Sequence, residues 1–133
     1  MILTYKYRLL PSKRQHTALS AICESQRQLY NAALQERIDC YQKTGKGRSY
    51  FDQCRALTEW RRDDVEAATM PANIQRWTIK RLDCAYASFF HRVKAGRKPG
   101  FPRFRGKGRW SSFGFNERSG IQFDSRRLRK RLR

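Results

Sequence analysis

Apolar and basic side chains alternate at the N-terminus of the chain. Tyr5, Tyr7 and Leu9 occupy every second position of residues 4–10, and Pro11 follows them. Side chains two positions apart lie on the same face of a strand, and aromatic residues favour this conformation. Since proline cannot donate a ladder hydrogen bond, we predict a strand over residues 4–10 that ends at Pro11.

The first long helical pattern covers residues 12–44. Ser12 is a favourable N-cap, and a glycine-rich run that begins at Gly45 ends the pattern. The predicted apolar face, at positions three and four apart, contains Leu19, Ile22, Leu29, Ala33, Ile38 and Tyr41. Gln26 and Arg37 interrupt this face.

Two further helices are predicted, over residues 50–62 and 71–95, and the connector 63–70 has no clear pattern. Pro71 is well suited to the first turn of the latter helix. The shorter helix is expected to direct four side chains toward the core, namely Phe51, Cys54, Leu57 and Trp60. The longer helix has the most regular apolar face of the chain, formed by Ile74, Thr78, Leu82, Ala85, Phe89 and Val93.

The composition changes after residue 95. Residues 96–108 are rich in glycine and proline, which predicts an irregular loop. Residues 110–115 and 120–124 are predicted to form short strands, and the basic tail 126–133 is expected to be disordered when free. The expected fold class is therefore α+β, with a strand, three helices and two more strands.

Charge indicates the class of partner. The chain has 30 Lys and Arg against 11 Asp and Glu, a formal net charge of +19, whereas a small domain usually carries a charge of about 2–8 in magnitude. Residues 91–133 hold 15 of the basic and 2 of the acidic residues. A polyanion would neutralise this excess and gain affinity through counterion release. We therefore predict a nucleic-acid-binding protein that mainly contacts the phosphate backbone.

The sequence gives little support to a membrane-spanning segment, a metal site or a cofactor site. No apolar run approaches the roughly 20 residues of a membrane span, so no membrane partner is expected, and neither is a small-molecule substrate. Asp63, Asp64 and Glu66 are adjacent and follow two arginines, which is typical of a solvated turn. Zinc-ligand spacing is missing from the four cysteines, Cys23, Cys40, Cys54 and Cys84. We expect reduced cysteines, no metal, no cofactor and a cytoplasmic location.

The loop 96–108 interleaves aromatic and basic side chains. Its phenylalanines and cations are Phe101, Phe104, Arg97, Lys98, Arg103 and Arg105. Aromatic rings offer stacking faces for bases, and guanidinium groups bind phosphates in a forked geometry. In the competing interpretation the phenylalanines only anchor a solvated loop to the core, and a mixture of both roles is favoured.

Five short motifs occur in an order that resembles a known family. They are K-Y-R-L-x-P at residues 6–11, R-x-x-Y-N at 27–31, G-K-G at 45–47, A-Y-x-x-F-F at 85–90 and G-F-P-R-F-R at 100–105. Together they resemble the N-terminal region of the TnpB (OrfB) proteins of bacterial insertion sequences. The resemblance covers about residues 3–124.

This resemblance implies a helix-turn-helix region, a helical recognition lobe inserted in a β-barrel wedge domain, and a domain over residues 1–125. Full-length members of the family are RNA-guided DNA endonucleases that read a short target-adjacent motif, so DNA and a guide RNA are the implied partners. None of the carboxylates of this chain matches the family's nuclease motif, and its zinc ribbon is missing. We therefore expect a truncated transposase-associated protein of the bacterial cytosol or nucleoid that binds and is not an enzyme. The alternatives are a free-standing DNA-binding regulator and an RNA- or ribosome-associated basic protein.

The resemblance also places Tyr50 and Arg76 where family members contact the target-adjacent motif. Arginine suits the O6 and N7 acceptors of guanine. The alternative is that Arg76 contacts only phosphate. The complete set of candidate nucleic-acid-binding residues is Lys6, Arg8, Arg27, Tyr30, Asn31, Tyr50, Arg76, Lys80, Arg97, Lys98, Phe101, Arg103, Phe104 and Arg105.

Overall fold

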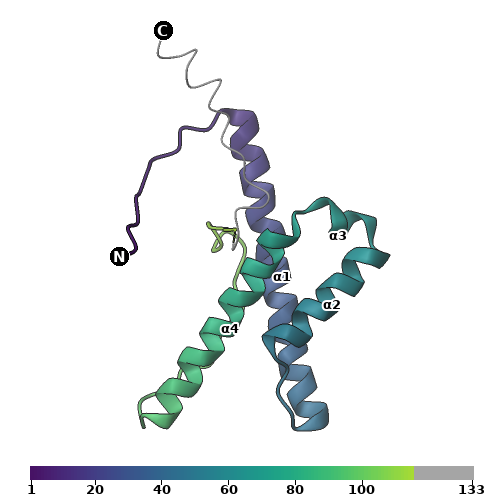
Figure 1. Ribbon diagram of the computed structural model, residues 1–133, viewed down its shortest axis with the longest axis vertical. Helices are drawn as coiled ribbons and strands as arrows, with labels where there is room; N and C mark the ends of the chain where they lie inside the picture. Colours follow the sequence, from purple (N-terminus) through teal and green to yellow (C-terminus); the bar gives the residue numbers. More distant parts are fainter. Residues whose placement is uncertain (116–133) are drawn as a thin grey trace.

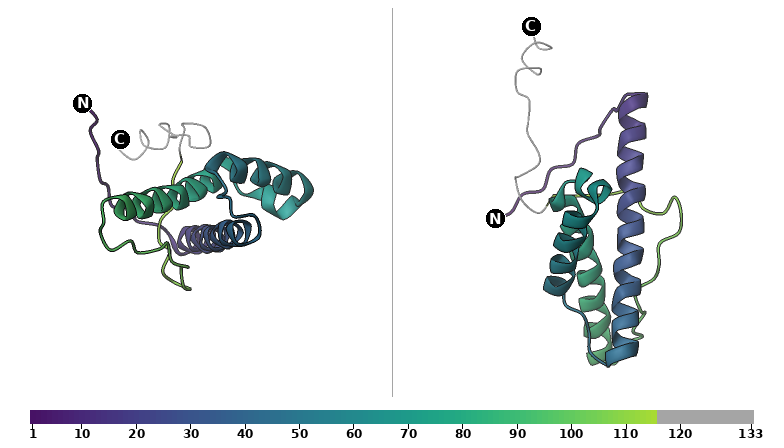
Figure 2. Two further views of the ribbon diagram at one scale, coloured as in Figure 1. Left: turned by 90° about the horizontal axis from the view of Figure 1, so that it is seen from below. Right: turned by 90° about the vertical axis from the view of Figure 1, so that its right-hand side faces the viewer.

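The computed structural model describes residues 1–115, and these residues are largely helical. The helices are α1 (Lys13–Thr44), α2 (Tyr50–Asp63), α3 (Val65–Thr69) and α4 (Ala72–Lys94). In Figure 1, α1 and α4 cross near the middle of α1 and diverge toward their C-terminal ends. Helix α4 packs against both α1 and α2, and the segment that follows α4 turns back along α1 (Figure 2).

Helix α1 begins and ends where its sequence predicts. The Ser12 hydroxyl accepts a hydrogen bond from the Gln15 backbone N–H at 3.3 Å, and the Gln15 side chain accepts from the Ser12 N–H at 2.9 Å. This capping box satisfies two N–H groups that the first helical turn leaves without partners. At the other end Gly45 has a φ of 70° and donates to the Tyr41 carbonyl, a left-handed geometry that glycine adopts without a steric penalty.

The connector between the second and third predicted helices forms a short helix, α3. The Asp64 carboxylate accepts from the backbone N–H groups of Glu66 and Ala67, so this acidic residue acts as an N-cap. Arg61 of α2 donates to the carbonyls of Ala67 and Met70. These contacts hold α3 against the end of α2.

The core lies where α1, α4 and the returning segment meet. Its buried cluster consists of Tyr30, Ala33, Leu34, Leu82, Tyr86 and Trp110. The rings of Tyr30 and Trp110 lie 4.9 Å apart. Trp110 belongs to none of the predicted helices, so the chain after α4 contributes directly to the core.

The polar residues that interrupt the apolar face of α1 are buried. Gln26 is fully buried and accepts a hydrogen bond from the Thr78 hydroxyl of α4 at 2.6 Å. Arg37 donates to the Gln53 side chain of α2 at 2.7 Å and to the Asp83 carboxylate of α4 at 3.1 Å. Buried polar groups need such partners, and these bonds link three helices that contact one another along different faces.

The α+β prediction is wrong for the described residues, which contain no strand. Residues 1–11 run as an exposed segment without regular structure, and residues 110–115 form no strand although Trp110 is buried. Alternation predicts which side chains share a face, but a strand also needs a hydrogen-bonded partner, and residues 1–115 supply none. The wedge-type barrel is therefore not supported. The predicted strand 120–124, the tail 126–133 and the domain boundary at 125 lie outside the described residues.

Candidate nucleic-acid interface

Tyr50, Arg76 and Lys80 meet on one surface, which we call the Tyr50 surface. Tyr50 is the first residue of α2, and the other two lie one turn apart on α4. The Lys80 ammonium lies 4.9 Å from the centre of the Tyr50 ring, close enough for a cation–π interaction. Lys80 and Arg76 are both exposed, so the surface presents two cations beside a partly buried phenol.

Burial strengthens the preference of this phenol for its neutral form. Desolvation, followed by a hydrogen bond with Cys54, raises the pKa of Tyr50 to about 12, and the positive charge of Arg76 opposes the shift. Tyr50 is therefore a neutral hydroxyl at physiological pH, able to donate one hydrogen bond and accept others. Asp83 lies 3.7 Å from the Lys80 ammonium and helps to orient it.

Arg27, Tyr30, Asn31 and Arg105 form a second cluster, the Arg105 junction. The Asn31 amide donates to the Arg105 carbonyl at 2.9 Å and accepts from the Arg105 N–H at 2.8 Å. Arg27 donates to the same carbonyl at 3.0 Å and pairs with Glu24 through two bonds. The R-x-x-Y-N motif of α1 therefore holds the G-F-P-R-F-R loop by its backbone.

The side chains of the Arg105 junction differ in how much surface they expose. Tyr30 is only 2% exposed and packs in the core, which leaves a base no face on which to stack. The Arg105 guanidinium is exposed and lies 5.9 Å from the centre of the Tyr30 ring. Arg105 is thus the member of the cluster that is best placed for phosphate.

The loop between α4 and Arg105 presents its cations to solvent. Arg97, Lys98 and Arg103 are exposed, and Arg92 of α4 donates to the carbonyls of Pro99 and Gly100, which fixes the path of the loop. Its two phenylalanines differ. Phe101 is 47% exposed and packs edge-on against Tyr86 and Phe89 of α4, whereas Phe104 is 51% exposed and makes no such ring contact within residues 1–115.

The remaining candidates, Lys6 and Arg8, lie on the exposed N-terminal segment. Within residues 1–115 the structure joins them to no other candidate residue through a hydrogen bond or ion pair. The same part of the chain gathers no three His, Cys, Asp or Glu side chains that could hold a metal ion.

Sequence reasoning missed the role of Arg81. Its guanidinium lies 4.3 Å from the Trp110 ring and 5.6 Å from the Trp77 ring, and it donates to the Ser112 hydroxyl. Trp77 also lies against Gly114, where an added Cβ would approach the indole nitrogen to 2.5 Å. The glycine in the run W-S-S-F-G was the available signal, since glycine inside a predicted strand often marks a close approach.

The chain is similar in sequence to known proteins. Residues 1–46 match the OrfB family of insertion sequence IS605, which is described as a helix-turn-helix domain. A Streptomyces pristinaespiralis protein whose name describes it as a candidate RNA-guided DNA endonuclease is 28% identical over 108 residues. That alignment covers 77% of this chain and 25% of the relative, so the chain spans about a quarter of the relative's length.

The match can be placed on the structure. Residues 1–46 contain α1 and its C-cap glycine, and the helix that follows the turn is α2. The matched segment therefore contains α1 and the start of the following turn, and α2 lies beyond it. No helix of the described chain has the length and apolar character that a membrane crossing requires. The family match and the Streptomyces relative therefore agree with the resemblance of this chain to the N-terminal region of TnpB/OrfB proteins, on which its motifs were matched.

Proposed function

We propose that this chain binds DNA mainly through phosphate contacts and reads a short target-adjacent motif with the Tyr50 surface. The observation that carries the proposal is the meeting of Tyr50, Arg76 and Lys80, which come from two helices. Lys80 is oriented by Tyr50 and Asp83, while Arg76 is exposed with its guanidinium near a neutral phenol. A hydrogen-bonding phenol between two cations suits a DNA groove, where cations contact phosphates and a forked guanidinium reads guanine.

The exposed cations of the loop would supply the sequence-independent part of the affinity. Each phosphate that a protein neutralises releases counterions, so the logarithm of the affinity falls by roughly 0.7–0.9 per contact for each unit of log salt. Arg97 and Lys98 are adjacent, exposed and free of ion pairs within residues 1–115. They are the clearest candidates for such contacts.

A salt titration with paired variants tests this part of the proposal. Replacing Arg97 and Lys98 by Ala should reduce the slope of log affinity against log salt by roughly 1.4–1.8. Replacing Lys13 and Arg14 removes the same charge from the exposed start of α1 and serves as the matched control. Equal slopes for the two double variants would place the phosphate contacts elsewhere, and a salt-independent affinity would contradict phosphate binding altogether.

We further propose that a guide RNA accompanies the chain and that these 133 residues bind without cutting. The name of the Streptomyces relative and the family resemblance support the RNA partner. Sequencing of the RNA that co-purifies with the chain, expressed from its own locus, should give one enriched species. A purified chain that retains DNA and no RNA would favour the free-standing regulator. Cleavage of DNA in Mg²⁺ that is lost on Asp63→Ala or Asp64→Ala would contradict binding without cutting.

A further inference from the structure

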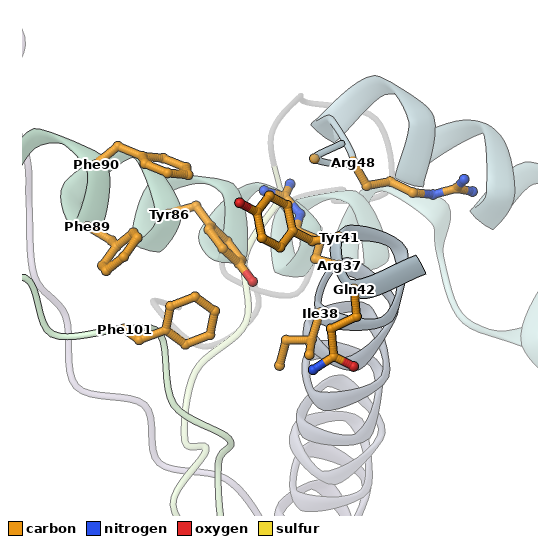
Figure 3. Close-up of a pocket in the computed structure, with 10 residues that line it drawn as sticks. Arg37, Ile38, Tyr41, Gln42, Arg48, Tyr86, Phe89, Phe90 and Phe101 are labelled. Atoms are coloured by element: carbon orange, nitrogen blue, oxygen red, sulfur yellow. The ribbon is translucent and has the colours of Figure 1, made fainter. Parts of the chain in front are cut away.

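A cavity of about 390 Å³ opens where α1 and α4 diverge toward their C-terminal ends. Figure 3 shows aromatic rings from α4 and from the loop on one side of it, facing side chains of α1 on the other. Its main walls are Tyr86, Phe89, Phe90, Phe101, Ile38 and Tyr41. The volume lies at the lower end of the range of about 300–1,000 Å³ that is usual for small-molecule sites.

The aromatic wall of the cavity is held in place and yet accessible. Phe101 packs edge-on against Tyr86 at 5.5 Å and against Phe89 at 5.3 Å, and the Phe90 ring lies 5.2 Å from that of Phe89. Nevertheless Phe90 is 55% exposed and Tyr41 is 65% exposed. Large clustered apolar groups that remain in contact with water are typical of a binding site.

The charge around this cavity indicates what would cover the rings. The two segments that supply most of its walls, residues 41–48 and 86–105, contain nine Lys and Arg and no Asp or Glu. Lys46, next to the lining residue Gly47, and Lys98, in the loop before Phe101, form no ion pair among the described residues. The lining residue Arg37 is fixed by Asp83, and its guanidinium lies 4.8 Å from the centre of the Tyr86 ring. Flat aromatic walls flanked by cations suit a ligand that is both aromatic and polyanionic.

We propose that the cavity receives an unstacked base of a single-stranded nucleic acid, while Lys46 and Lys98 contact the flanking phosphates. This inference rests on the proposed nucleic-acid binding and adds a site that distinguishes single strands from duplexes. A base within a duplex is stacked and paired, so entering the cavity would require its extrusion. A base in a single strand is available, and stacking on aromatic side chains tolerates any base.

The test compares two single strands that have equal charge. A 12-nucleotide oligothymidine and an abasic strand of the same length carry the same phosphates and differ only in their bases. Wild-type chain should bind the oligothymidine about 5- to 100-fold more tightly, the range expected for one stacked base. Phe90→Ala should bring this ratio close to one, and Phe90→Tyr, which keeps a ring, should restore it.

Phe51→Ala is the matched control for Phe90→Ala. Phe51 is also an exposed helical phenylalanine in edge contact with a neighbouring ring, and it lies outside the cavity. Phe51→Ala should leave the ratio of the two affinities, for oligothymidine and for the abasic strand, unchanged. Circular dichroism should show both variants folded. Crosslinking of a 5-iodouracil strand to a wall residue, mapped by mass spectrometry, reports the site even if Phe90→Ala fails to fold.

The outcomes distinguish the proposed base site in the cavity from the proposed nucleic-acid binding as a whole. Equal binding of the intact and abasic strands, with salt-dependent duplex binding retained, overturns the base site alone. Failure to bind any nucleic acid overturns both. A dimer that Phe90→Ala dissociates in sedimentation, without discrimination between the strands, would instead identify the cavity as a contact between copies of this chain.

Discussion

The Arg105 junction and the Tyr50 surface are built from similar residues and differ in what their polar groups contact. Each combines an arginine with a tyrosine where α1 or α4 meets a neighbouring segment. At the junction Asn31 and Arg27 bond to the backbone of Arg105, and Tyr30 is in the core. At the Tyr50 surface Arg76 and Lys80 remain exposed.

Residue type alone therefore does not distinguish a side chain that could bind a ligand from one that holds the fold together. Guanidinium and amide groups recognise a backbone carbonyl and a phosphate with the same donors. What separates them is whether a carbonyl of the chain already occupies those donors. The junction therefore positions a loop whose own cations face solvent, while Arg76 and Lys80 of the Tyr50 surface are bonded to no backbone carbonyl among the described residues and remain exposed.

The largest expected effect is on the buried tyrosine of the junction. Tyr30→Ala should lower the free energy of unfolding by about 3–5 kcal/mol, because it removes a buried ring and leaves a cavity beside Trp110. Tyr30→Phe keeps the ring and should cost little. Urea denaturation followed by circular dichroism measures both changes. If Tyr30→Ala weakened DNA binding while the stability stayed unchanged, the junction would be a binding site after all.

The next effect concerns the Tyr50 surface. If Arg76 reads a guanine, Arg76→Ala should relax the preference at one base position by roughly 1–3 kcal/mol. A binding selection over randomised duplexes measures this preference. The control Arg55→Ala removes the same charge from an exposed side chain of α2 and should weaken all sequences alike. The same uniform loss for Arg76→Ala would identify Arg76 as a phosphate contact.

A smaller effect is expected for the amide of the junction. Asn31→Ala removes two hydrogen bonds to the Arg105 backbone, each worth about 0.5–1.5 kcal/mol. The freed loop should be cut faster by trypsin after Arg103 and Arg105. Gln35→Ala, one turn further along α1, changes another exposed amide and should leave the cutting rate as it is. An equal rate for Asn31→Ala would mean that the loop is held by other contacts.

The helices were predictable because their signals are local. Ser12 and Gly45 mark the ends of α1 through contacts within a few residues, and the apolar period of α4 identifies Ile74 and Leu82 as buried. The faces of α1 were harder to assign. Different residues of α1 contact α4, α2 and the returning segment, and Arg37 is buried while Tyr41 is exposed.

The site could be predicted only in part for a similar reason. The sequence marks Asn31 and Arg105 as polar and basic, but their pairing spans 74 positions, and no local pattern reports such a contact. Nor could alternation show that Tyr5 and Tyr7 lack a strand partner among residues 1–115. Tyr50 and Arg76 were named through the family resemblance and Lys80 as a basic residue of the predicted helix 71–95, and the structure brings the three together. Whether they contact DNA stays a prediction.

The smallest expected effect depends on pH and concerns the partner of Arg27. The hydrogen bond from Arg27 is the main cause that lowers the pKa of the Glu24 carboxyl below its ordinary value. A carboxyl whose pKa is lower in the folded state stabilises the fold fully above its ordinary pKa and loses this contribution as the pH falls through the lowered value. Acidification between about pH 5 and pH 2 should therefore loosen the hold of Arg27 on the Arg105 carbonyl.

Melting temperatures measured across this pH range test the effect. In Glu24→Gln the melting temperature should fall slightly less steeply with decreasing pH, because one of the carboxyls with a lowered pKa is gone. The Asp52 carboxyl also has a lowered pKa, because of its backbone hydrogen bond with Ser49. Part of the fall in melting temperature at low pH should therefore remain in Glu24→Gln. The control Glu59→Gln removes a carboxylate that forms no ion pair within residues 1–115. If the Glu24→Gln curve ran parallel to the wild-type curve, Arg27 would hold the loop without help from Glu24.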